Sequence, residues 1–367
     1  MADFDKISIN KTYYNVKDAS ARQQITQLQE AIENIDVSTL KTVFDVTEYG
    51  ADSTGAAYSD NAVSRIMSEN ASGIIFFPAG IYKFQNPITV EKPFKFVGVY
   101  EYGNYAKENA YGSKLRFATN GFVVKIGGCQ ICNLAIFWGD NSSGASDTYI
   151  GVDIQNAVSA ENVSINLFFQ NLYIQDFRFG INSEAQTVFM STFINIWVNG
   201  GDTAYRFRTT GNCTSLTFIS CWGTWQTNVT WNLNRVYYST LISCGSDNSQ
   251  FGYAIDNCLK VSMIACGVES VTGSTVPAAR FDHSSVCKIE LFGSSITSAT
   301  AFIQLIQCGG MQLDIYCNDN IATSVLDDSG GAGRNSMLGY CRGTVTVSGT
   351  TFTPDAYVRP LTTAQTS

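Results

Sequence analysis

Asp247 and Glu269 are the two carboxylates whose types and spacing suit acid–base chemistry. Each lies six residues after the start of a short apolar run, at Leu241 and Met263, so the two occupy equivalent positions of a repeat. If the repeats stack about 4.8 Å apart, as neighbouring strands do, the carboxylates repel each other and one of them favours a proton. Cleavage of a glycosidic bond uses such a pair, one as acid and one as base or nucleophile. The alternative is a pair of solvated surface carboxylates.

Aromatic residues stand beside these carboxylates in the same alignment. The position two residues earlier reads, along successive copies, Tyr173, Trp197, Trp222, Gly245 and Gly267. Trp225 follows close by. Aromatic faces contact the apolar C–H side of a sugar ring, and the change to glycine predicts a step in the surface beside the acidic pair. We therefore expect these aromatic residues to bind a sugar, with packing against a neighbouring subunit as the alternative.

Other candidate groups offer weaker chemistry. Arg206, in the charged stretch 202–208, is a candidate partner for a sugar substituent, and the alternative is an ion pair with a nearby acid. Asp282 and His283 resemble a carboxylate–imidazole pair, but no serine motif accompanies them, so we assign them structural roles. The glycine-rich stretch 329–333 lacks the Lys-Ser/Thr of a phosphate loop. With a single histidine in the chain we expect no metal, and we expect no cofactor.

The elements that must position these residues form an internal repeat. Short apolar runs begin at Ile131, Phe169, Phe193, Phe218, Leu241 and Met263, with weaker copies at Leu291 and Leu313. From Phe169 onward they recur every 22 to 28 residues, which fits three short strands and three bends. Stacking the copies places Asn133, Asn171 and Asn195 in one column, and Cys221, Cys244 and Cys266 in the next. We interpret the first column as an asparagine ladder at a bend and the second as an interior file. The pattern predicts an all-β parallel solenoid, held together by contacts between neighbouring coils.

Composition excludes several classes of protein. The 367 residues are 45% hydrophobic and 13% aromatic, so the chain is not disordered. The net charge of −8 argues against duplex DNA and anionic membranes as partners. No apolar run reaches a membrane span, and the N-terminus lacks the pattern of an export signal. We therefore expect the eleven cysteines to be buried free thiols. Among them, Cys213, Cys258 and Cys308 form a second, gapped column.

The chain divides into segments of different character. We expect an attachment segment with a short helix at 1–40, a cap region at 41–128, coils at 129–326 and a strand-rich end at 327–367. Residues 59–70 predict a helix with an apolar face, and 74–82 a buried strand. Residues 23–35 carry an apolar heptad pattern. This pattern indicates a parallel coiled-coil neck between subunits or, alternatively, an ordinary amphipathic cap helix.

Two segments resemble known families. Phe44-Asp-Val-Thr-Glu-Tyr-Gly-Ala-Asp, Ser59-Asp-Asn-Ala and Phe77-Pro-Ala-Gly-Ile-Tyr resemble the opening of the pectate-lyase-like right-handed parallel β-helix superfamily. This resemblance covers residues 43 to about 85, and the coils at 129–326 extend it. Residues 7–22 resemble a segment at the front of bacteriophage tail proteins. Together the segments resemble a phage tailspike, which implies a homotrimer that binds, and often cleaves, the surface polysaccharide of a host.

The sequence departs from the polygalacturonases of this superfamily. Those enzymes carry Gly-His-Gly and paired aspartates, whereas the single histidine here is His283, and Asp327-Asp328 lies after the coils. Pectinase activity of that type is therefore not expected.

The resemblance leads to the following expectations. The chain binds host surface polysaccharide and cleaves it as a glycosidase-type depolymerase, with hydrolysis favoured over elimination. The alternative is a receptor-binding or structural tail protein without turnover. As partners we expect the polysaccharide, two further copies of the chain and other tail or baseplate proteins, the last through residues 1–35. We expect neither nucleic acid binding nor membrane insertion, and a location in the virion tail.

Overall fold

The fold is known from a computed structural model of the chain. It describes residues 6–9, 12–15, 42–100, 112–139, 145–155, 164–184, 187–296, 298–317, 319, 323–328, 335–341 and 344–347. The expected neck at 23–35, and most of segments 1–40 and 327–367, lie outside these residues. The chain forms two compact units, 1–43 and 44–367. In the first unit, β1 (Lys6–Ile9) pairs antiparallel with β2 (Thr12–Asn15).

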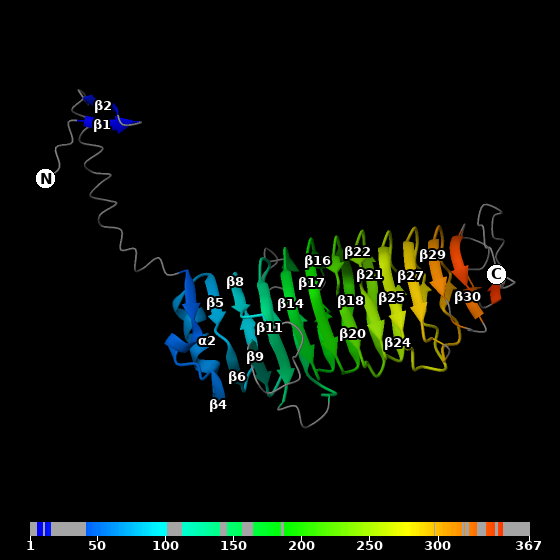
Figure 1. The fold of residues 1–367 in the computed structure, drawn as a ribbon, viewed down its shortest axis with the longest axis horizontal. Coiled ribbons are helices and arrows are strands. Elements are labelled where there is room, and N and C mark those ends of the chain that lie inside the picture. The colour runs from blue at the N-terminus through cyan, green and yellow to red at the C-terminus, as the bar shows by residue number, and fades with distance from the viewer. Residues whose placement is uncertain are drawn as a thin grey trace, which may run out of the picture. The chain divides into compact units, whose positions relative to one another are not determined.

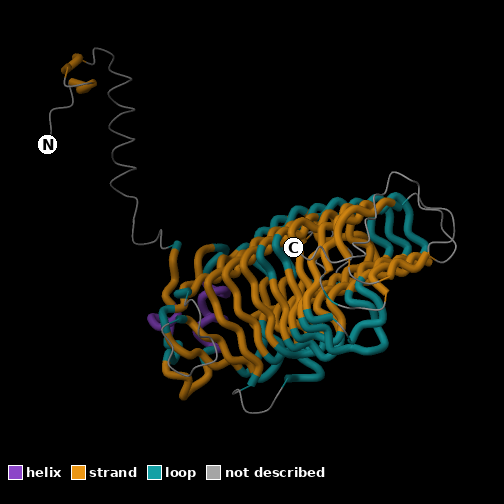
Figure 2. The backbone as a smooth tube through the Cα atoms, turned by 45° about the vertical axis from the view of Figure 1, so that its right-hand side comes forward, coloured by secondary structure: helices purple, strands orange, loops and turns teal. Residues whose placement is uncertain are grey.

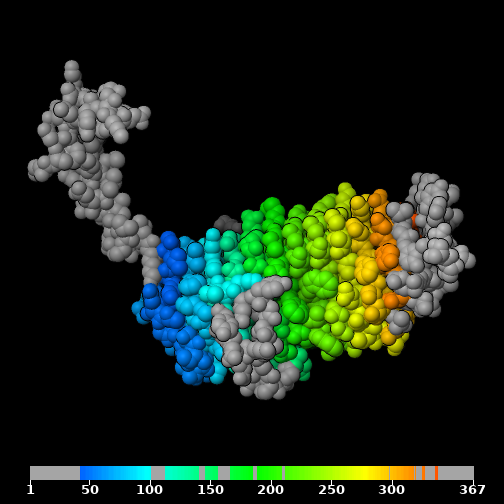
Figure 3. All heavy atoms as spheres, viewed as in Figure 1, coloured from blue at the N-terminus to red at the C-terminus, as the bar shows by residue number. Residues whose placement is uncertain are grey.

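The second unit is a parallel β-solenoid whose coils stack along one axis (Figure 1). Each complete coil contributes strands to two long parallel sheets, and the space-filling view shows the coils as successive bands (Figure 3). The first sheet contains β3 (Val43–Asp45), β4 (Thr54–Tyr58), β5 (Gly73–Phe77), β6 (Gly80–Phe84), β8 (Phe94–Gly98), β9 (Ser113–Phe117), β11 (Gln130–Trp138), β14 (Phe168–Gln175), β17 (Thr192–Asn199), β19 (Thr217–Ile219), β20 (Trp222–Thr224), β22 (Thr240–Ile242), β23 (Gly245–Asp247), β25 (Ser262–Glu269), β27 (Lys288–Ser294), β29 (Gln312–Cys317) and β31 (Ser336–Cys341).

The second sheet faces the first across the core. It contains β7 (Ile88–Val90), β10 (Phe122–Val124), β12 (Ile150–Ile154), β15 (Phe179–Ser183), β18 (Thr203–Thr214), β21 (Val229–Tyr237), β24 (Phe251–Asp256), β26 (Ala279–Asp282), β28 (Ile303–Ile306), β30 (Thr323–Asp328) and β32 (Thr344–Val347). Beside them, β16 (Thr187–Phe189) pairs with β18, and β13 (Ser164–Ile165) pairs with β16. The predicted parallel solenoid is confirmed.

The bend predicted from the asparagine column is present. Asn133, Asn171 and Asn195 all have left-handed backbone conformation, with φ of 60°, 53° and 51°. The Asn171 Nδ2 donates to Asn133 Oδ1 at 2.9 Å, and the Asn195 Nδ2 donates to Asn171 Oδ1 at 2.9 Å. Asparagine tolerates this conformation better than most residues, so the ladder satisfies the amides and fixes the bend together. In later coils Ser220, Ser243 and Ala265 keep the conformation.

The interior confirms the alignment of most copies. The predicted starts from Ile131 to Met263 lie opposite one another in the register of the first sheet. Cys221, Cys244 and Cys266 form one buried file, with exposed fractions of 0%, 0% and 1%. The copy predicted at Leu291 is wrong in phase, because Met263 pairs with Ile289 and Leu291 pairs with Cys266. The described cysteines are free, and all except Cys132 are buried.

A helix begins the solenoid, as predicted. The helix α2 (Asp60–Glu69) follows the short 3-10 helix η2 (Val46–Tyr49) and buries Ala62, Val63 and Ile66 against the first coils. Its position at one end of the stack is visible in Figure 2. The Asp60 carboxylate accepts the backbone N–H groups of Gln85 and Asn86, at 3.0 and 2.8 Å, which fixes the helix to the chain that follows β6. The apolar run at 74–82 forms β5 and the start of β6, with a turn between them.

Candidate functional site

Asp247 and Glu269 lie on neighbouring coils, at the ends of β23 and β25. They are direct partners in the parallel register, and both side chains are partly exposed. The Asp247 Oδ1 accepts a hydrogen bond from Asn248 Nδ2 at 3.0 Å. Neither carboxylate joins an ion pair with another described residue. The expected side-by-side placement is therefore present, and both groups remain open to a ligand.

The aromatic column beside them is also in register. Tyr173 pairs with Trp197, Trp197 with Trp222, and Trp222 with Gly245. Trp197 is 44% exposed, and Trp225, at the corner directly after β20, is 62% exposed. The Trp197 Nε1 donates to Thr224 Oγ1 at 2.9 Å, which fixes the orientation of the indole ring. These tryptophans present apolar surface on the outer face of the first sheet.

Tyr173 differs from the expectation, because its side chain is buried, with only 3% exposed. Its hydroxyl donates to Gln175 Oε1 at 2.7 Å and accepts from Asn199 Nδ2 at 3.1 Å. Burial raises the pKa of Tyr173 to about 12. Its ring meets Trp197 edge to face, with centroids 5.6 Å apart. Tyr173 therefore packs against Trp197 and does not offer the face of its own ring to a ligand.

The predicted glycine step is partly filled by Trp222. A Cβ atom placed on Gly245 would lie 2.5 to 2.6 Å from three atoms of the Trp222 ring. At Gly267 the same ring is 4.0 Å from such an atom. The indole of Trp222 thus lies flat over Gly245 and ends near Gly267, on the coils that carry Asp247 and Glu269. The glycines make room for an aromatic platform beside the acidic pair.

Arg206 does not join this group, because it lies on the other sheet. In β18 its backbone pairs with Asn182 of β15. Its Nη1 donates to Asn182 Oδ1 at 2.7 Å and pairs with the Glu184 carboxylate. Its guanidinium also lies 4.7 Å from the centre of the Phe179 ring. The structural alternative, an ion pair with a nearby acid, describes its contacts.

A hollow that the sequence did not predict lies on the outer face of the second sheet. It has a volume of about 400 Å³, and its lining includes Asp153, Gln155, Asn182 and Glu184. Asp153 accepts from Asn182 Nδ2 and from Gln155 Nε2, both at 2.8 Å. Asp153 and Asn182 are both buried in this network, with exposed fractions of 7% and 3%. The sequence signal was the alignment of Asp153 with Asn182 and Arg206, which becomes visible only when the strands of the second sheet are placed.

A second group of charges lies further along that sheet. Asp256 pairs in register with Asp282, and Arg280 Nη2 lies 3.5 Å from Asp256 Oδ1. Burial raises the pKa of Asp256, and Arg280 opposes that rise. His283 Nδ1 lies 2.6 Å from Asp282 Oδ1. These groups contact one another, and the structural role expected for Asp282 and His283 stays a prediction.

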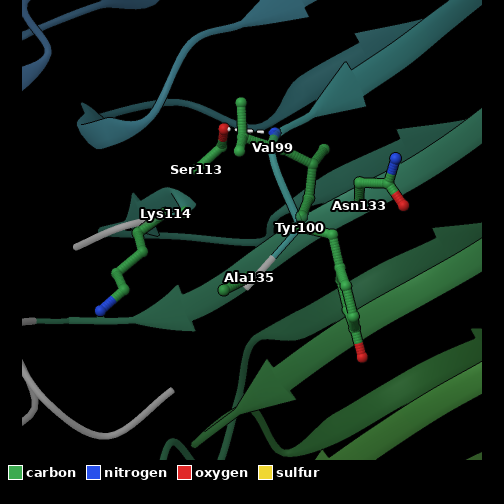
Figure 4. Close-up of a pocket in the computed structure, with 8 residues that line it drawn as sticks. Val99, Tyr100, Ser113, Lys114, Asn133 and Ala135 are labelled. Atoms are coloured by element: carbon green, nitrogen blue, oxygen red, sulfur yellow. Dashed lines mark hydrogen bonds between the residues drawn. The ribbon is translucent and has the colours of Figure 1, made fainter. Parts of the chain in front are cut away.

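A small hollow lies at the N-terminal end of the aromatic column (Figure 4). Lys114 and Ala135 continue the column there, and the Val99 N–H donates to Ser113 Oγ at 2.8 Å. Its volume of about 10 Å³ is that of one water molecule. It is therefore too small for a sugar ring.

Neither a metal cluster nor a membrane-spanning helix is found among the described residues. Within them, no group of three histidine, cysteine or acidic side chains is placed to hold a metal ion. No helix in that part of the chain has the length and apolar character to cross a membrane.

Comparison with solved structures shows a shared fold. The tailspike gp42 of Acinetobacter phage vb_AbaP_AS12 matches with a TM-score of 0.63 at 13% identity, over 87% of this chain and 67% of that one. The catalytic unit of the GH87 α-1,3-glucanase of Streptomyces thermodiastaticus HF3-3 matches with 0.52 at 12% identity, over 84% and 64%. The enzymatically active domain of bacteriophage CBA120 tailspike protein 2 matches with 0.51 at 10% identity, over 88% and 54%. The chain thus spans about two thirds of the first two proteins and about half of the third.

Sequence comparison identifies the family. A search of curated proteins finds no match to this chain. A family model described as rhamnogalacturonase A/epimerase, pectate lyase-like, matches residues 43–253, which is more than half of the chain. This match begins at the segment whose motifs suggested the resemblance and continues through the stacked coils. With its parallel β-solenoid and this match, the chain belongs to the rhamnogalacturonase A/epimerase, pectate lyase-like family.

Proposed function

We propose that this protein binds a bacterial surface polysaccharide on the outer face of its first sheet and cleaves it there. The observation that carries the proposal is the register of that sheet, which sets the Asp247–Glu269 pair beside the Trp222 platform. The family and the fold shared with tailspikes and a glucanase support a carbohydrate ligand. Trp197 and Trp225 extend the apolar surface on which sugar rings stack.

The proposed reaction is hydrolysis of a glycosidic bond. One carboxyl group protonates the oxygen of the leaving sugar, while the other acts as a base on water or as a nucleophile at the anomeric carbon. Because the two residues are direct partners on neighbouring strands, the sheet holds their side chains next to each other. Trp222 would hold the sugar ring over Gly245, so that the bond to be cleaved lies beside the carboxylates.

The test is an incubation of the purified full chain with a panel of bacterial capsule and O-antigen preparations. New reducing ends and shorter chains are the expected result. Asp247→Asn and Glu269→Gln should each stop this release while circular dichroism and the unfolding temperature stay unchanged. Unaltered cleavage by both variants would overturn the assignment of these residues.

The alternative is a receptor-binding protein without turnover. Its supporting observation is the absence of the polygalacturonase motifs from the coils. Retention of a polysaccharide by the wild-type chain without any shortening would favour this alternative. Loss of that retention in Trp222→Ala would still place the ligand on the first sheet.

We further propose that the chain is a homotrimer in a phage tail, attached through residues 1–35. The likeness of residues 7–22 to the front of phage tail proteins supports this assignment. Light scattering of the full chain should give the mass of three copies, and deletion of residues 1–35 should abolish its incorporation into virions. A monomer at micromolar concentration would contradict the trimer.

A further inference from the structure

The aromatic column of the first sheet resumes beyond the two glycines. In the parallel register Gly267 lies opposite Phe292 of β27, which lies opposite Tyr316 of β29. The strands β25, β27 and β29 run side by side in Figure 1. Phe292 is 43% exposed and Tyr316 is 45% exposed. Their rings stack with centroids 5.3 Å apart and planes 10° from parallel. They form a second exposed apolar patch on the same sheet as Trp222.

This second surface lies where the shape of the coil changes. Ile264 and Ala265 stand opposite the single residue Glu290, because the left-handed bend of the earlier coils is missing from β27. The straight strand beside a bent one leaves a hollow of about 340 Å³. Its lining includes Ala265, Glu290, Phe292, Asp314 and Tyr316. The stacked rings therefore border a depression rather than a ridge.

Two carboxylates flank these rings. Glu290 and Asp314 are exposed and are direct partners in the register of β27 and β29. Neither takes part in an ion pair among the described residues. Lys288 is the one basic residue in β23, β25, β27 and β29, whereas Asp247 and Glu269 add two more acids. This face is acidic, with hydrogen-bond acceptors on both sides of the aromatic column.

We infer that Phe292 and Tyr316 form a second sugar-binding subsite, which holds a distant ring of the same glycan that Trp222 holds. The inference rests on the proposed function. Trp222 and Phe292 are three coils apart, about 14 Å at the spacing of parallel strands, so one oligosaccharide running along the solenoid reaches both. The ligand is a neutral glycan or one with amino groups, because an acidic glycan would be repelled by the carboxylates.

The charge of this face also argues against a two-fold contact with a second copy of the chain. Such a contact places the same surface patch of both copies against each other. It would therefore crowd Glu290 and Asp314 of one copy against those of another, with Lys288 alone to offset them. Sugar hydroxyl groups, in contrast, donate hydrogen bonds to exposed carboxylates without bringing charge.

The experiment compares the wild-type chain with the Phe292→Ala/Tyr316→Ala variant on the polysaccharide that the wild type cleaves. On the polymer we expect KM to rise about tenfold, which corresponds to about 1.4 kcal/mol, with kcat nearly unchanged. On the shortest fragment that the wild type still cleaves, both constants should be equal in the two proteins. Tyr316→Phe should behave as the wild type, since it keeps the ring. Tyr58→Ala, which removes a 58% exposed ring at the far end of the solenoid, is the matched control.

The outcomes separate the two proposals. Equal KM values of the double variant and the wild type on the polymer, with both proteins folded, would overturn the second subsite and leave the proposed function intact. A wild-type chain that binds none of the polysaccharides would overturn both. Uronic acid in every repeat of the bound polysaccharide would overturn the inference about its charge.

Discussion

The outer faces of the two sheets both carry charged residues but use them differently. On the second sheet, Arg206 contacts Glu184, and Arg280 contacts Asp256. On the first sheet, Asp247 and Glu269 stand beside exposed indole rings and join no ion pair with another described residue. The second sheet thus compensates its charges within the protein, whereas the first presents charge and apolar surface to a ligand.

This contrast follows from what each arrangement costs. A half-buried carboxylate such as Asp256 is destabilised unless a cation or hydrogen bonds compensate it. An exposed carboxylate such as Glu269 is stabilised by water and needs no partner, so it is available for chemistry. The comparison teaches that a charged column in a solenoid is a candidate site only where its charges are not already paired.

The largest expected effect is on cleavage. Asp247→Asn and Glu269→Gln should each lower kcat by about 10²–10⁴-fold, the usual contribution of a positioned acid or base. Asp282→Asn, also an outward aspartate of a neighbouring coil, is the matched control and should leave kcat unchanged. Initial rates of reducing-end release measure all three. If only Asp282→Asn lost activity, the catalytic residues would lie on the second sheet and not on the first.

A smaller effect is expected on glycan affinity. Trp222→Ala removes the platform over Gly245 and should weaken binding about tenfold or more, as truncation of a central aromatic residue does. Gly245→Ala should act in the same direction, because the added methyl group displaces the Trp222 ring. Trp222→Phe, which keeps an aromatic face, should lose less. Calorimetric titration with an oligosaccharide compares the variants, and equal affinities throughout would remove Trp222 from the site.

On the second sheet we expect a loss of stability without a loss of activity. Arg280→Met removes the nearest cation from the half-buried Asp256 carboxylate, leaving only the weaker effect of Arg208, and should cost about 1–3 kcal/mol at pH 7. Arg280→Lys should retain part of that stability. Urea unfolding measures the difference, and a simultaneous loss of cleavage would contradict a purely structural role.

The same pair predicts a dependence on pH. Burial raises the pKa of Asp256, so the folded state holds this proton more tightly than the unfolded state. Stability from this group is therefore complete at low pH and falls as the pH rises through the folded pKa. Removal of Arg280 raises that pKa further, so Arg280→Met should lose more stability at pH 7 than near pH 3. An equal loss at both values would show that Arg280 acts through packing and not through charge.

The smallest effect is expected at Glu184. Its side chain is 64% exposed, and exposed ion pairs contribute less than about 1 kcal/mol. Glu184→Gln should therefore change neither stability nor glycan affinity measurably. Because Glu184 lines the hollow of the second sheet, a clear drop in affinity would place glycan there.

The stacking of the coils was predictable from the sequence because parallel register repeats the same environment in each coil. The aligned residues Asn171 and Asn195 indicated a bend, since their side-chain amides hydrogen-bond to each other when the coils stack. The aligned residues Cys244 and Cys266 indicated an interior file, since a column of small apolar side chains is typical of the core. The adjacency of Asp247 and Glu269 followed from the same register.

The remaining features depend on local geometry that spacing does not contain. Arg206 lies in β18 of the second sheet, whereas the repeated apolar runs lie in the first sheet. The face that carries Arg206 was therefore not predictable. Tyr173 shares a column with Trp197 but is buried, because it packs in a cluster with Ala135 and Phe137 of the preceding coil. The return of the column at Phe292 was hidden because the bend disappears after Ala265, which put the predicted copy at Leu291 out of phase.

The most direct test of the account is a crystal structure of the Glu269→Gln variant soaked with an oligosaccharide of the polysaccharide that the wild type cleaves. The account predicts sugar rings on the first sheet, with one ring over Trp222 and a glycosidic oxygen between position 269 and Asp247. Sugar density in the hollow beside Asp153 and Asn182, with the first sheet empty, would contradict it.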